Sequence, residues 1–383
     1  MNILWLCRWF GNYRIPVYKE LHRLTNGDFY MAYSEESVSK LVNEQMKEAL
    51  GNNALPLENE KHLIIGNPDS NFANKYLDVA WQPGILDVIS KVNPDVIISD
   101  GFYQWTYAGI LKSFHRKLCI FYERTSYVER NAPKWRQIYR KCIGHFADGF
   151  IINGSLTKEY LKTLGLDNKP LAIGCMVADS EGLSKAVKET KSDEIADLKE
   201  QLNIKQGGLI YLFVGQLVKR KGIDELLKEW CSHIKNYPDD YIIVAGQGVL
   251  EKELKDKYGD IPGVRFVGQV SYDKIHSYYA MADVVVMPTL EDNWSLVVPE
   301  AMSCAKPVMT TVYNGCHVEL IDQGNNGYRY DPLIPGEGCK ILGKFHEKDL
   351  ESMGKRSQEM IVDYTPVKAA EKIYKLCQEI TKK

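Results

Sequence analysis

A turn of three consecutive basic residues separates an apolar run from an amphipathic segment in the second half of the chain. Lys219, Arg220 and Lys221 follow the apolar run at 210–214, and apolar residues recur with helical spacing from 223 to 234. The start of a helix carries unpaired N–H groups and partial positive charge, and both attract phosphate. The added cations therefore predict a site for a diphosphate.

Glycines stand on both sides of this basic turn, at Gly215 and Gly222. Because glycine has no Cβ, the backbone at these positions can come close to a bound group. A basic surface loop is the plain alternative, and the paired glycines weigh against it.

A second polar loop, which carries acidic residues, follows the apolar run at 283–287. Asp292 lies in this loop, and Glu300 lies eight positions later in the first helical turn, where Pro299 is tolerated. Carboxylates that face one site can accept hydrogen bonds from ribose or sugar hydroxyls, each contributing about 1.5–3 kcal/mol. Charge complementarity at the helix start is the alternative explanation of Glu291 and Asp292.

The order and spacing of several motifs in residues 207–335 resemble those of glycosyltransferase family 4. The motifs are Gly-Gln-Leu-x-x-Arg-Lys-Gly at 215–222, Ala-Gly-Gln-Gly at 245–248, Val-Arg-Phe-Val-Gly-Gln-Val at 264–270, Tyr-Ala-x-Ala-Asp at 279–283, the acids before Ala301-Met302, and Pro307-Val308. The resemblance implies an α/β protein with the GT-B fold, in which two Rossmann-like domains with parallel sheets face a central cleft. It also implies a hexosyltransferase that uses a nucleotide-diphosphate sugar as substrate, retains the anomeric configuration and needs no metal or cofactor.

The resemblance also implies roles for individual residues. Arg220 and Lys221 match the cations that hold the donor diphosphate, Asp292 with the loop amides after it holds the donor sugar, and Glu300 holds the ribose. The loop that follows Val267 lies near the base. The full set of implied donor-binding residues is Gly11, Gly215, Gln216, Val267, Gln269, Glu291, Asn293, Trp294, Ser295 and Leu296.

Three positions in the second half depart from the family pattern. Gln216 stands where many members have arginine, and Ala305 stands where glycine is common. Asp292 takes the place of the first glutamate of the E-x7-E motif and is one methylene shorter. Because Glu291 precedes it, the sequence leaves open which of the two acids reaches the sugar.

The first half carries a predicted acceptor site. Many relatives have a histidine after the strand that corresponds to 118–122, but here Glu123 and Arg124 follow it. We predict that Glu123 takes a catalytic or acceptor role, with structural ion pairing as the alternative. Tyr13, Arg14 and Arg124 are the predicted acceptor contacts.

Apolar runs alternate with helical patterns along the whole chain, which is typical of parallel sheets covered by helices. The sequence predicts a first domain at 1–178 with the C-terminal helix 366–383, a linker at 179–206 with one surface helix, and a donor-binding domain at 207–365. Ser295 is the predicted N-cap of the helix that follows it. The predicted strands are Ile3–Cys7, Asp95–Ser99, Leu118–Tyr122, Gly149–Asn153, Ile210–Val214, Tyr241–Ala245, Arg265–Val267, Asp283–Met287 and Pro307–Thr310.

The composition of the 383 residues is that of an ordinary globular protein, with 45% hydrophobic and 26% charged residues. The net charge of -2 gives no reason to expect a nucleic-acid partner. Nine cysteines without a C-x-x-C pair favour a reducing compartment, and no apolar stretch reaches the length of a membrane span. We therefore expect a cytoplasmic protein. The sequence contains no Asp-x-Asp motif, so nothing in it suggests a diphosphate held by a metal.

The stretch 110–145 is strongly basic, since nine cations face only two acids there. A solvated helix face is one interpretation, and a surface for an anionic acceptor or lipid is the other. The second predicts peripheral contact with the inner face of the cell membrane and a glycan or lipid-linked glycan acceptor, as in surface polysaccharide biosynthesis. The cations are Lys112, Arg116, Lys117, Arg124, Arg130, Lys134, Arg136, Arg140 and Lys141.

Three other functions are compatible with parts of this pattern. A catalytically silent sugar-nucleotide-binding protein agrees with Gln216 and the missing histidine. A nucleotide-sugar epimerase would share the fold. A dinucleotide dehydrogenase is disfavoured, because the glycines at 246 and 248 lack the third glycine of that motif.

Overall fold

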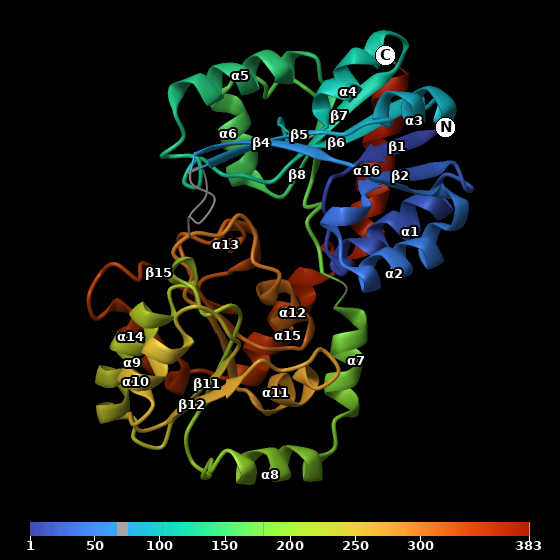
Figure 1. The fold of residues 1–383 in the computed structure, drawn as a ribbon. Coiled ribbons are helices and arrows are strands. Elements are labelled where there is room, and N and C mark those ends of the chain that lie inside the picture. Colours follow the sequence, from blue (N-terminus) through green and yellow to red (C-terminus); the bar gives the residue numbers. More distant parts are fainter. Residues whose placement is uncertain (67–75, 104, 179, 383) are drawn as a thin grey trace. The chain divides into compact units, whose positions relative to one another are not determined.

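The computed structural model describes residues 1–66, 76–103, 105–178 and 180–382. The chain divides into two compact units (Figure 1). Unit 1 consists of Met1–Ala178 and Asp363–Lys383, and unit 2 consists of Asp179–Val362.

Unit 1 is built on a seven-stranded parallel sheet with the strand order β3-β2-β1-β6-β7-β8-β9. Its strands are β1 (Ile3–Leu6), β2 (Phe29–Ser34), β3 (Ala54–Leu57), β6 (Val96–Asp100), β7 (Lys117–Tyr122), β8 (Gly149–Ile152) and β9 (Leu171–Ile173). A separate antiparallel ribbon joins β4 (Lys61–Gly66) to β5 (Tyr76–Trp81).

The helices of unit 1 are α1 (Ile15–Leu24), α2 (Lys40–Leu50), α3 (Ile85–Val92), α4 (Thr106–Leu111), α5 (Lys134–His145), α6 (Ser155–Thr163) and α16 (Pro366–Thr381). The last helix returns to this unit and packs against α1 (Figure 1). Its buried positions Ala370, Ile373 and Cys377 have the spacing of one helix face, so the same stripe both defines the helix and docks it.

Unit 2 is built on a six-stranded parallel sheet with the order β12-β11-β10-β13-β14-β15. Its strands are β10 (Ile210–Val214), β11 (Tyr241–Ala245), β12 (Val264–Gly268), β13 (Val284–Met287), β14 (Val308–Thr311) and β15 (Gly327–Tyr330). Its helices are α7 (Glu181–Glu189), α8 (Ser192–Gln201), α9 (Ile223–Asn236), α10 (Glu251–Tyr258), α11 (Ile275–Met281), α12 (Val297–Ser303), α13 (His317–Leu320), α14 (Glu337–Lys344) and α15 (Leu350–Ile361).

The central strands of both sheets are continuous apolar runs because both of their faces are covered. Every residue of β1, β11 and β13 is buried, as expected for strands inside parallel α/β layers. The nine strands predicted from the sequence are confirmed to within one residue at each end. The prediction of α/β units with parallel sheets is therefore confirmed.

The surface helix expected at Asp193–Leu202 is present as α8, but the segment 179–206 is part of unit 2 and not a separate linker. It forms two helices, α7 and α8, which belong to unit 2. Leu183 is buried, and the Ser184 hydroxyl donates a hydrogen bond of 2.8 Å to the carbonyl of Ser303. The many charged residues of this segment lie on the outer faces of the two helices. A few inward-facing residues pack the helices against the rest of unit 2.

Candidate functional site

The basic turn of unit 2 is a short 3-10 helix, η5 (Lys219–Lys221), between β10 and α9. It ends at Gly222, whose φ of 66° lies in the left-handed region that favours glycine. A Cβ at this position would overlap the carbonyl oxygen of Pro288 at the end of β13. Gly222 is thus needed for close packing between two strand ends, as well as for the turn itself.

The basic turn and the acidic loop are joined by hydrogen bonds to one carbonyl group. The carbonyl oxygen of Arg220 accepts bonds from Leu290 N at 2.8 Å, Glu291 N at 3.2 Å and the Thr289 hydroxyl at 2.8 Å. We call this arrangement the Arg220 carbonyl lock. It fixes the start of the acidic loop against the basic turn, although the two are far apart in sequence.

The side chain of Asp292 points at the cations of the basic turn. Its Oδ2 lies 2.6 Å from Lys221 Nζ and 3.9 Å from Arg220 Nη1, and its Oδ1 accepts a bond from Trp294 N at 3.2 Å. Glu291 is buried, with 5% of its surface exposed. The geometry therefore brings Asp292, of the two neighbouring acids, to the predicted diphosphate site.

The loop between β13 and α12 contains buried polar atoms that make no hydrogen bond to the described part of the chain. They are Asn293 Oδ1 and Ser295 Oγ. A buried polar atom without a partner costs about 1–3 kcal/mol, and a hydroxyl of a bound ligand would remove that cost. Ser295 is not the N-cap of α12, contrary to the sequence prediction, because that position is taken by Leu296 and no side chain caps the helix.

A cavity of about 510 Å³ lies at the carboxyl ends of β10, β11 and β12. This volume suits a small ligand, and the carboxyl edge is where α/β sheets bind nucleotides. Gln269 lines the cavity, whereas Val267 is not among the lining residues. The lining consists of Val214, Gly215, Gln216, Val218, Ala245, Gly246, Gln247, Gly248, Val249, Gln269, Val270 and Ile275.

Glu300 lies in the first turn of α12, and the hydroxyl of Tyr279 donates a hydrogen bond of 3.2 Å to its Oε2. Removal from water raises the pKa of Glu300 to about 7, because burial penalises the charged carboxylate, and the bond from Tyr279 lowers it only in part. The carboxyl therefore changes its charge near neutral pH.

In unit 1, a charged cluster lies at the carboxyl ends of β1, β6 and β7. Arg14 Nη1 is 2.8 Å from Asp100 Oδ2, its Nη2 is 3.3 Å from Glu123, and its guanidinium lies 4.4 Å from the ring centre of Phe121. The predicted residues Arg14 and Glu123 are therefore in contact. Arg124 is 3.3 Å from Glu129.

Asp100 is the centre of this cluster, and sequence reasoning missed it. Besides Arg14, its carboxylate accepts bonds from Trp5 Nε1 at 2.7 Å and from the Cys7 thiol at 2.8 Å. Burial, reinforced by Asp100, raises the pKa of Cys7 well above its usual range. Its position could have identified it, because Asp100 directly follows the predicted strand Asp95–Ser99, at the edge of the sheet where ligands bind.

Tyr13 and Gly11 precede this cluster in the loop after β1. A Cβ at Gly11 would overlap the ring of Tyr13, so the glycine lets this ring lie over the backbone. Burial raises the pKa of Tyr13, so its hydroxyl stays neutral and can donate a hydrogen bond at physiological pH.

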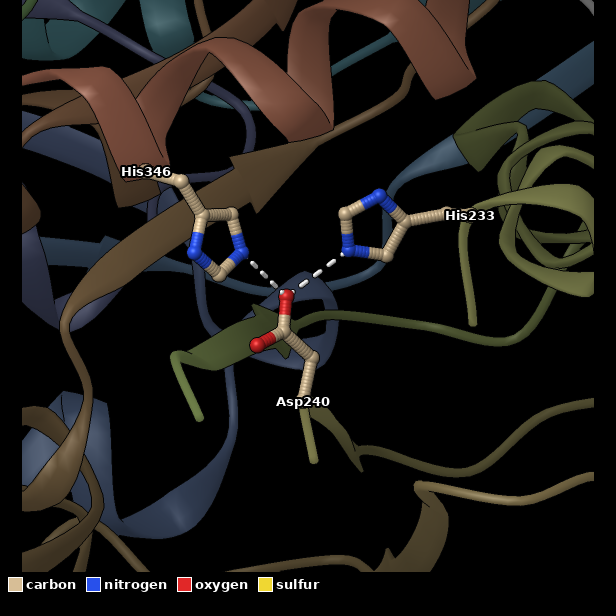
Figure 2. Close-up of side chains that lie close together, drawn as sticks. All are labelled: His233, Asp240 and His346. Atoms are coloured by element: carbon tan, nitrogen blue, oxygen red, sulfur yellow. Dashed lines mark hydrogen bonds and ion pairs between the residues drawn. The ribbon is translucent and has the colours of Figure 1, made fainter. Parts of the chain in front are cut away.

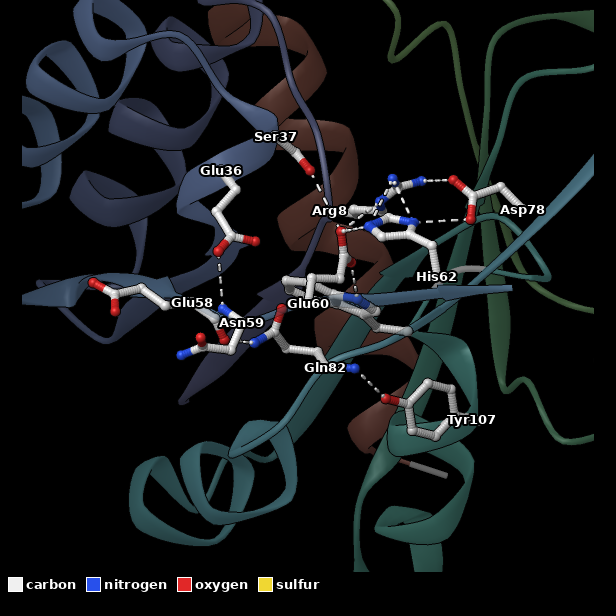
Figure 3. Close-up of polar contacts among 11 residues, drawn as sticks. Arg8, Glu36, Ser37, Glu58, Asn59, Glu60, His62, Asp78, Gln82 and Tyr107 are labelled. Carbon is white, nitrogen blue, oxygen red and sulfur yellow. Dashed lines mark hydrogen bonds and ion pairs between the residues drawn. The ribbon is translucent and has the colours of Figure 1, made fainter. Parts of the chain in front are cut away.

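A second polar network fixes the start of that loop (Figure 3). The side chain of Glu60 is 1% exposed and accepts bonds from Arg8 Nε at 2.7 Å and Trp105 Nε1 at 2.8 Å. Arg8 also lies 2.6 Å from Asp78, which pairs with His62 across the ribbon of β4 and β5. Arg8 is thus held on both sides, and it anchors the ribbon to the chain that leaves β1.

One cluster of two imidazoles and one carboxylate could be mistaken for a metal site. Asp240 Oδ2 accepts hydrogen bonds from His233 Nε2 at 2.8 Å and His346 Nε2 at 2.7 Å (Figure 2). These N–O distances are those of hydrogen bonds with no ion between the atoms. His233 Nδ1 is buried without a hydrogen bond, whereas metal-bound histidines donate their second N–H to a partner. We interpret the cluster as a clamp that ties α9 to the chain after α14.

Residues 194–334 match the family model for glycosyl transferases group 1. Over these residues the chain is similar to group 1 glycosyltransferases. The D-inositol 3-phosphate glycosyltransferase of Corynebacterium kroppenstedtii is 23% identical over 310 residues, which cover 75% of this chain and 68% of that protein. The alpha-monoglucosyldiacylglycerol synthase of Acholeplasma laidlawii is 25% identical over 140 residues, which cover 36% of this chain and 35% of that protein.

The same fold is found in solved structures of GT-B glycosyltransferases. The Anabaena protein Alr3699/HepE in complex with UDP superposes with a TM-score of 0.76 and 16% identity, covering 99% of this chain and 100% of that one. The predicted GT-B fold is therefore confirmed.

The raised pKa of Glu300 predicts a pH-dependent contribution to stability. The folded pKa of about 7 exceeds the ordinary 4.5, so the contribution is fully present below pH 4.5 and is lost as the pH rises through 7. Between those limits, we expect wild type to lose at most about 3 kcal/mol of unfolding free energy relative to Glu300→Gln. Urea unfolding of both proteins from pH 4.5 to 7.5 measures this difference. Parallel pH curves for the two proteins would contradict the assignment.

Proposed function

We propose that this glycosyltransferase moves a hexosyl group from a nucleotide-diphosphate sugar to a glycan or lipid-linked glycan, with retention and without a metal or cofactor. We favour a UDP-sugar as the donor, with a GDP-sugar as the alternative. Complexes of Alr3699/HepE with UDP and with UDP-glucose support the first choice. A role in surface polysaccharide biosynthesis is part of the proposal.

The observation that carries the proposal is the contact of Lys221 with Asp292 beside Arg220. The pair is 2.6 Å apart, and the side chains of Lys221 and Asp292 are only 13% and 12% exposed. Lys221 is therefore held in one place before a donor arrives. A cation fixed in this way stabilises the negative charge that grows on the β-phosphate as it leaves.

The proposed reaction takes place on one face of the sugar. The bond from the anomeric carbon to the diphosphate oxygen breaks, and a bond from that carbon to the acceptor oxygen forms. The acceptor proton goes to an oxygen of the leaving diphosphate. In this proposal Asn293 and Ser295 exchange hydrogen bonds with the sugar hydroxyls, Asp292 accepts a bond from one of them, and Glu300 is the partner of the ribose.

The proposed acceptor-side residues are Glu123, Arg14, Tyr13 and Arg124. Arg14 is fixed by Asp100 and contacts Glu123, so the carboxylate of Glu123 has a defined position. Glu123 is 35% exposed at its side chain, which leaves it open to an acceptor hydroxyl.

A catalytically silent sugar-nucleotide-binding protein is the second candidate. Gln216 is exposed where many relatives carry arginine, and no histidine follows β7. A nucleotide-sugar epimerase on the same fold is the third. Product analysis separates them, since only a transferase forms a new glycosidic bond.

Lys221→Ala tests the donor site directly. We expect turnover to fall by about 10²–10³-fold, as when one donor to a developing oxyanion is removed. Lys219→Ala is the matched control, because Lys219 lies in the same basic turn but is exposed. Its activity should stay within a few-fold of wild type. Wild-type turnover in Lys221→Ala would show that the diphosphate binds elsewhere.

The basic stretch 110–145 divides into core and surface residues, so it is not uniformly solvated. Arg136 and Arg140 are 6% and 3% exposed, and Arg140 bonds to Glu129 and to the hydroxyl of Tyr160. Helix α5 therefore turns two cations toward the protein interior. The expectation that all nine cations share one surface is wrong.

The outward face of α5 carries an apolar stripe beside exposed polar residues such as Lys134, Gln137 and Lys141. Trp135 is 49% exposed, Ile138 is 65% exposed and Phe146 at the end of the helix is 56% exposed. These positions fall on one stripe at the helical period, and the exposed Lys134 and Lys141 lie along one side of it. An apolar stripe with lysines beside it is the pattern of a helix that lies in the interface of an anionic membrane.

We propose that α5 docks on the inner face of the cell membrane, where a lipid-linked acceptor would be available. The described residues contain no helix that is both long and apolar enough to cross a membrane. The relation to a monoglucosyldiacylglycerol synthase is compatible with an acceptor in lipid.

Co-sedimentation with vesicles tests this surface. We expect wild type to bind vesicles that contain phosphatidylglycerol more strongly than phosphatidylcholine vesicles, with binding reduced by added salt. Ile138→Glu should lower binding about tenfold or more, because a carboxylate would enter the lipid interface. Leu41→Glu is the control, since Leu41 is 62% exposed on α2. Equal binding to both vesicle types would contradict the proposal.

A further inference from the structure

Unit 1 contains a second cavity, of about 700 Å³, at the opposite edge of its sheet from the charged cluster around Asp100. It is lined by Asp95, Lys117 and Asp148, which lie at or just before the amino ends of β6, β7 and β8. Its size is within the usual range for small-molecule sites. None of the residues assigned to the transfer reaction lines it, so its ligand is not the donor.

The rim of this cavity is formed by two exposed aromatic side chains. Phe114 is 89% exposed and Phe146 is 56% exposed, and both line the cavity. Phe146 is also the last residue of the apolar stripe on α5. The cavity therefore opens at one end of the proposed membrane-docking face.

Arg116 is one of two cations in the cavity lining, beside the acids Asp95 and Asp148. Its Nη2 donates a bond of 2.8 Å to Asn93 Oδ1, and its Nη1 donates a bond of 3.1 Å to the carbonyl of Lys112. Its Nε is buried and has no hydrogen-bond partner among the described residues. Because both partners are neutral, the guanidinium keeps its full charge for an anion.

The two acids in the lining have partners other than Arg116, namely backbone amides and Lys117. Asp95 accepts a bond of 2.8 Å from Asn2 N. Asp148 accepts a bond of 2.9 Å from Leu118 N and lies 3.5 Å from Lys117 Nζ. His115, next to Phe114, also lines the cavity.

We propose that this cavity binds the phosphodiester headgroup of an anionic glycerophospholipid. Arg116 contacts the phosphate, and Phe114 and Phe146 contact the glycerol and the first methylenes of the acyl chains. Arginine is suited to phosphate by its planar set of donors, and exposed aromatic rings gain from apolar contact. The inference rests on the proposed docking of α5, and it assigns to that surface a specific lipid site.

A soluble short-chain lipid separates the headgroup site from general vesicle binding. We propose calorimetric titration of the full chain with dihexanoyl phosphatidylglycerol below its micelle concentration. Glycerol 3-phosphate and dihexanoyl phosphatidylcholine are titrated in parallel. The expected result is saturable binding of the anionic lipid, with both other compounds at least tenfold weaker. Equal affinity for glycerol 3-phosphate would mean a soluble phosphate ligand and would overturn the assignment to lipid.

Variants locate the binding. Arg116→Gln and Phe114→Ala should each weaken binding of dihexanoyl phosphatidylglycerol about tenfold, whereas Lys158→Gln, at an exposed cation of α6, should not. Phe114 is nearly fully exposed, so Phe114→Ala should leave the fold intact. This variant therefore still tests the site if Arg116→Gln unfolds the protein. Unchanged binding in Phe114→Ala would refute the site.

The outcome is distinguishable from failure of the wider proposal. Ile138→Glu should reduce vesicle binding but leave the titration with short-chain lipid unchanged, because Ile138 does not line the cavity. If vesicles fail to bind while the short-chain lipid binds, the docking proposal fails alone. If neither the vesicles nor the short-chain lipid bind, the proposed headgroup site is wrong. That result says nothing about binding of the nucleotide sugar in unit 2.

Discussion

The carbonyl group of Arg220 holds the proposed donor site together. Three donors from residues 289–291 converge on it, and Gly222 allows this turn to lie against Pro288. The lock brings together two strand-to-helix junctions that are about 70 positions apart in sequence. As a result, Lys221 and Asp292 meet at 2.6 Å, and a cation and a carboxylate are fixed at the edge of the sheet where nucleotides bind. The glycosyl transfer proposed for this chain depends on that fixed position, because charges that are already in place need no rearrangement when negative charge develops on the leaving group.

Much of the fold could be read from the sequence, because buried parallel strands are unbroken apolar runs. All nine strands recognised in this way are present. Two of the strands that were missed lack that signal, because β4 is exposed along its whole length and β9 has only three residues. The strand β2 was missed although five of its six residues are buried. The segment 179–206 was misread because its charges dominate the composition, while a few positions such as Leu183 dock it.

The site was predictable where residues follow strands and unpredictable where contacts are made by tertiary packing. Lys221 and Asp292 were predicted because each follows the end of a strand. Their direct pairing depends on backbone hydrogen bonds to the carbonyl of Arg220, and side-chain types do not predict such bonds. Likewise, Glu123 was found, whereas its link through Arg14 to Asp100 was not. Helix α5 shows the same limit, since its positive sequence suggested a charged face and its packing instead exposes Trp135 and Ile138. Charge counts alone do not say which side of a helix is buried.

The central claim is that unit 2 grips a sugar diphosphate with its own cations. Calorimetric titration of the full chain with UDP-glucose and GDP-mannose, in buffer that contains EDTA, tests it most directly. The account predicts saturable binding of one nucleotide sugar at a single site under these conditions, weakened at least tenfold in Lys221→Ala. Binding that appears only after a divalent ion is added, or no binding of either nucleotide sugar, would contradict it.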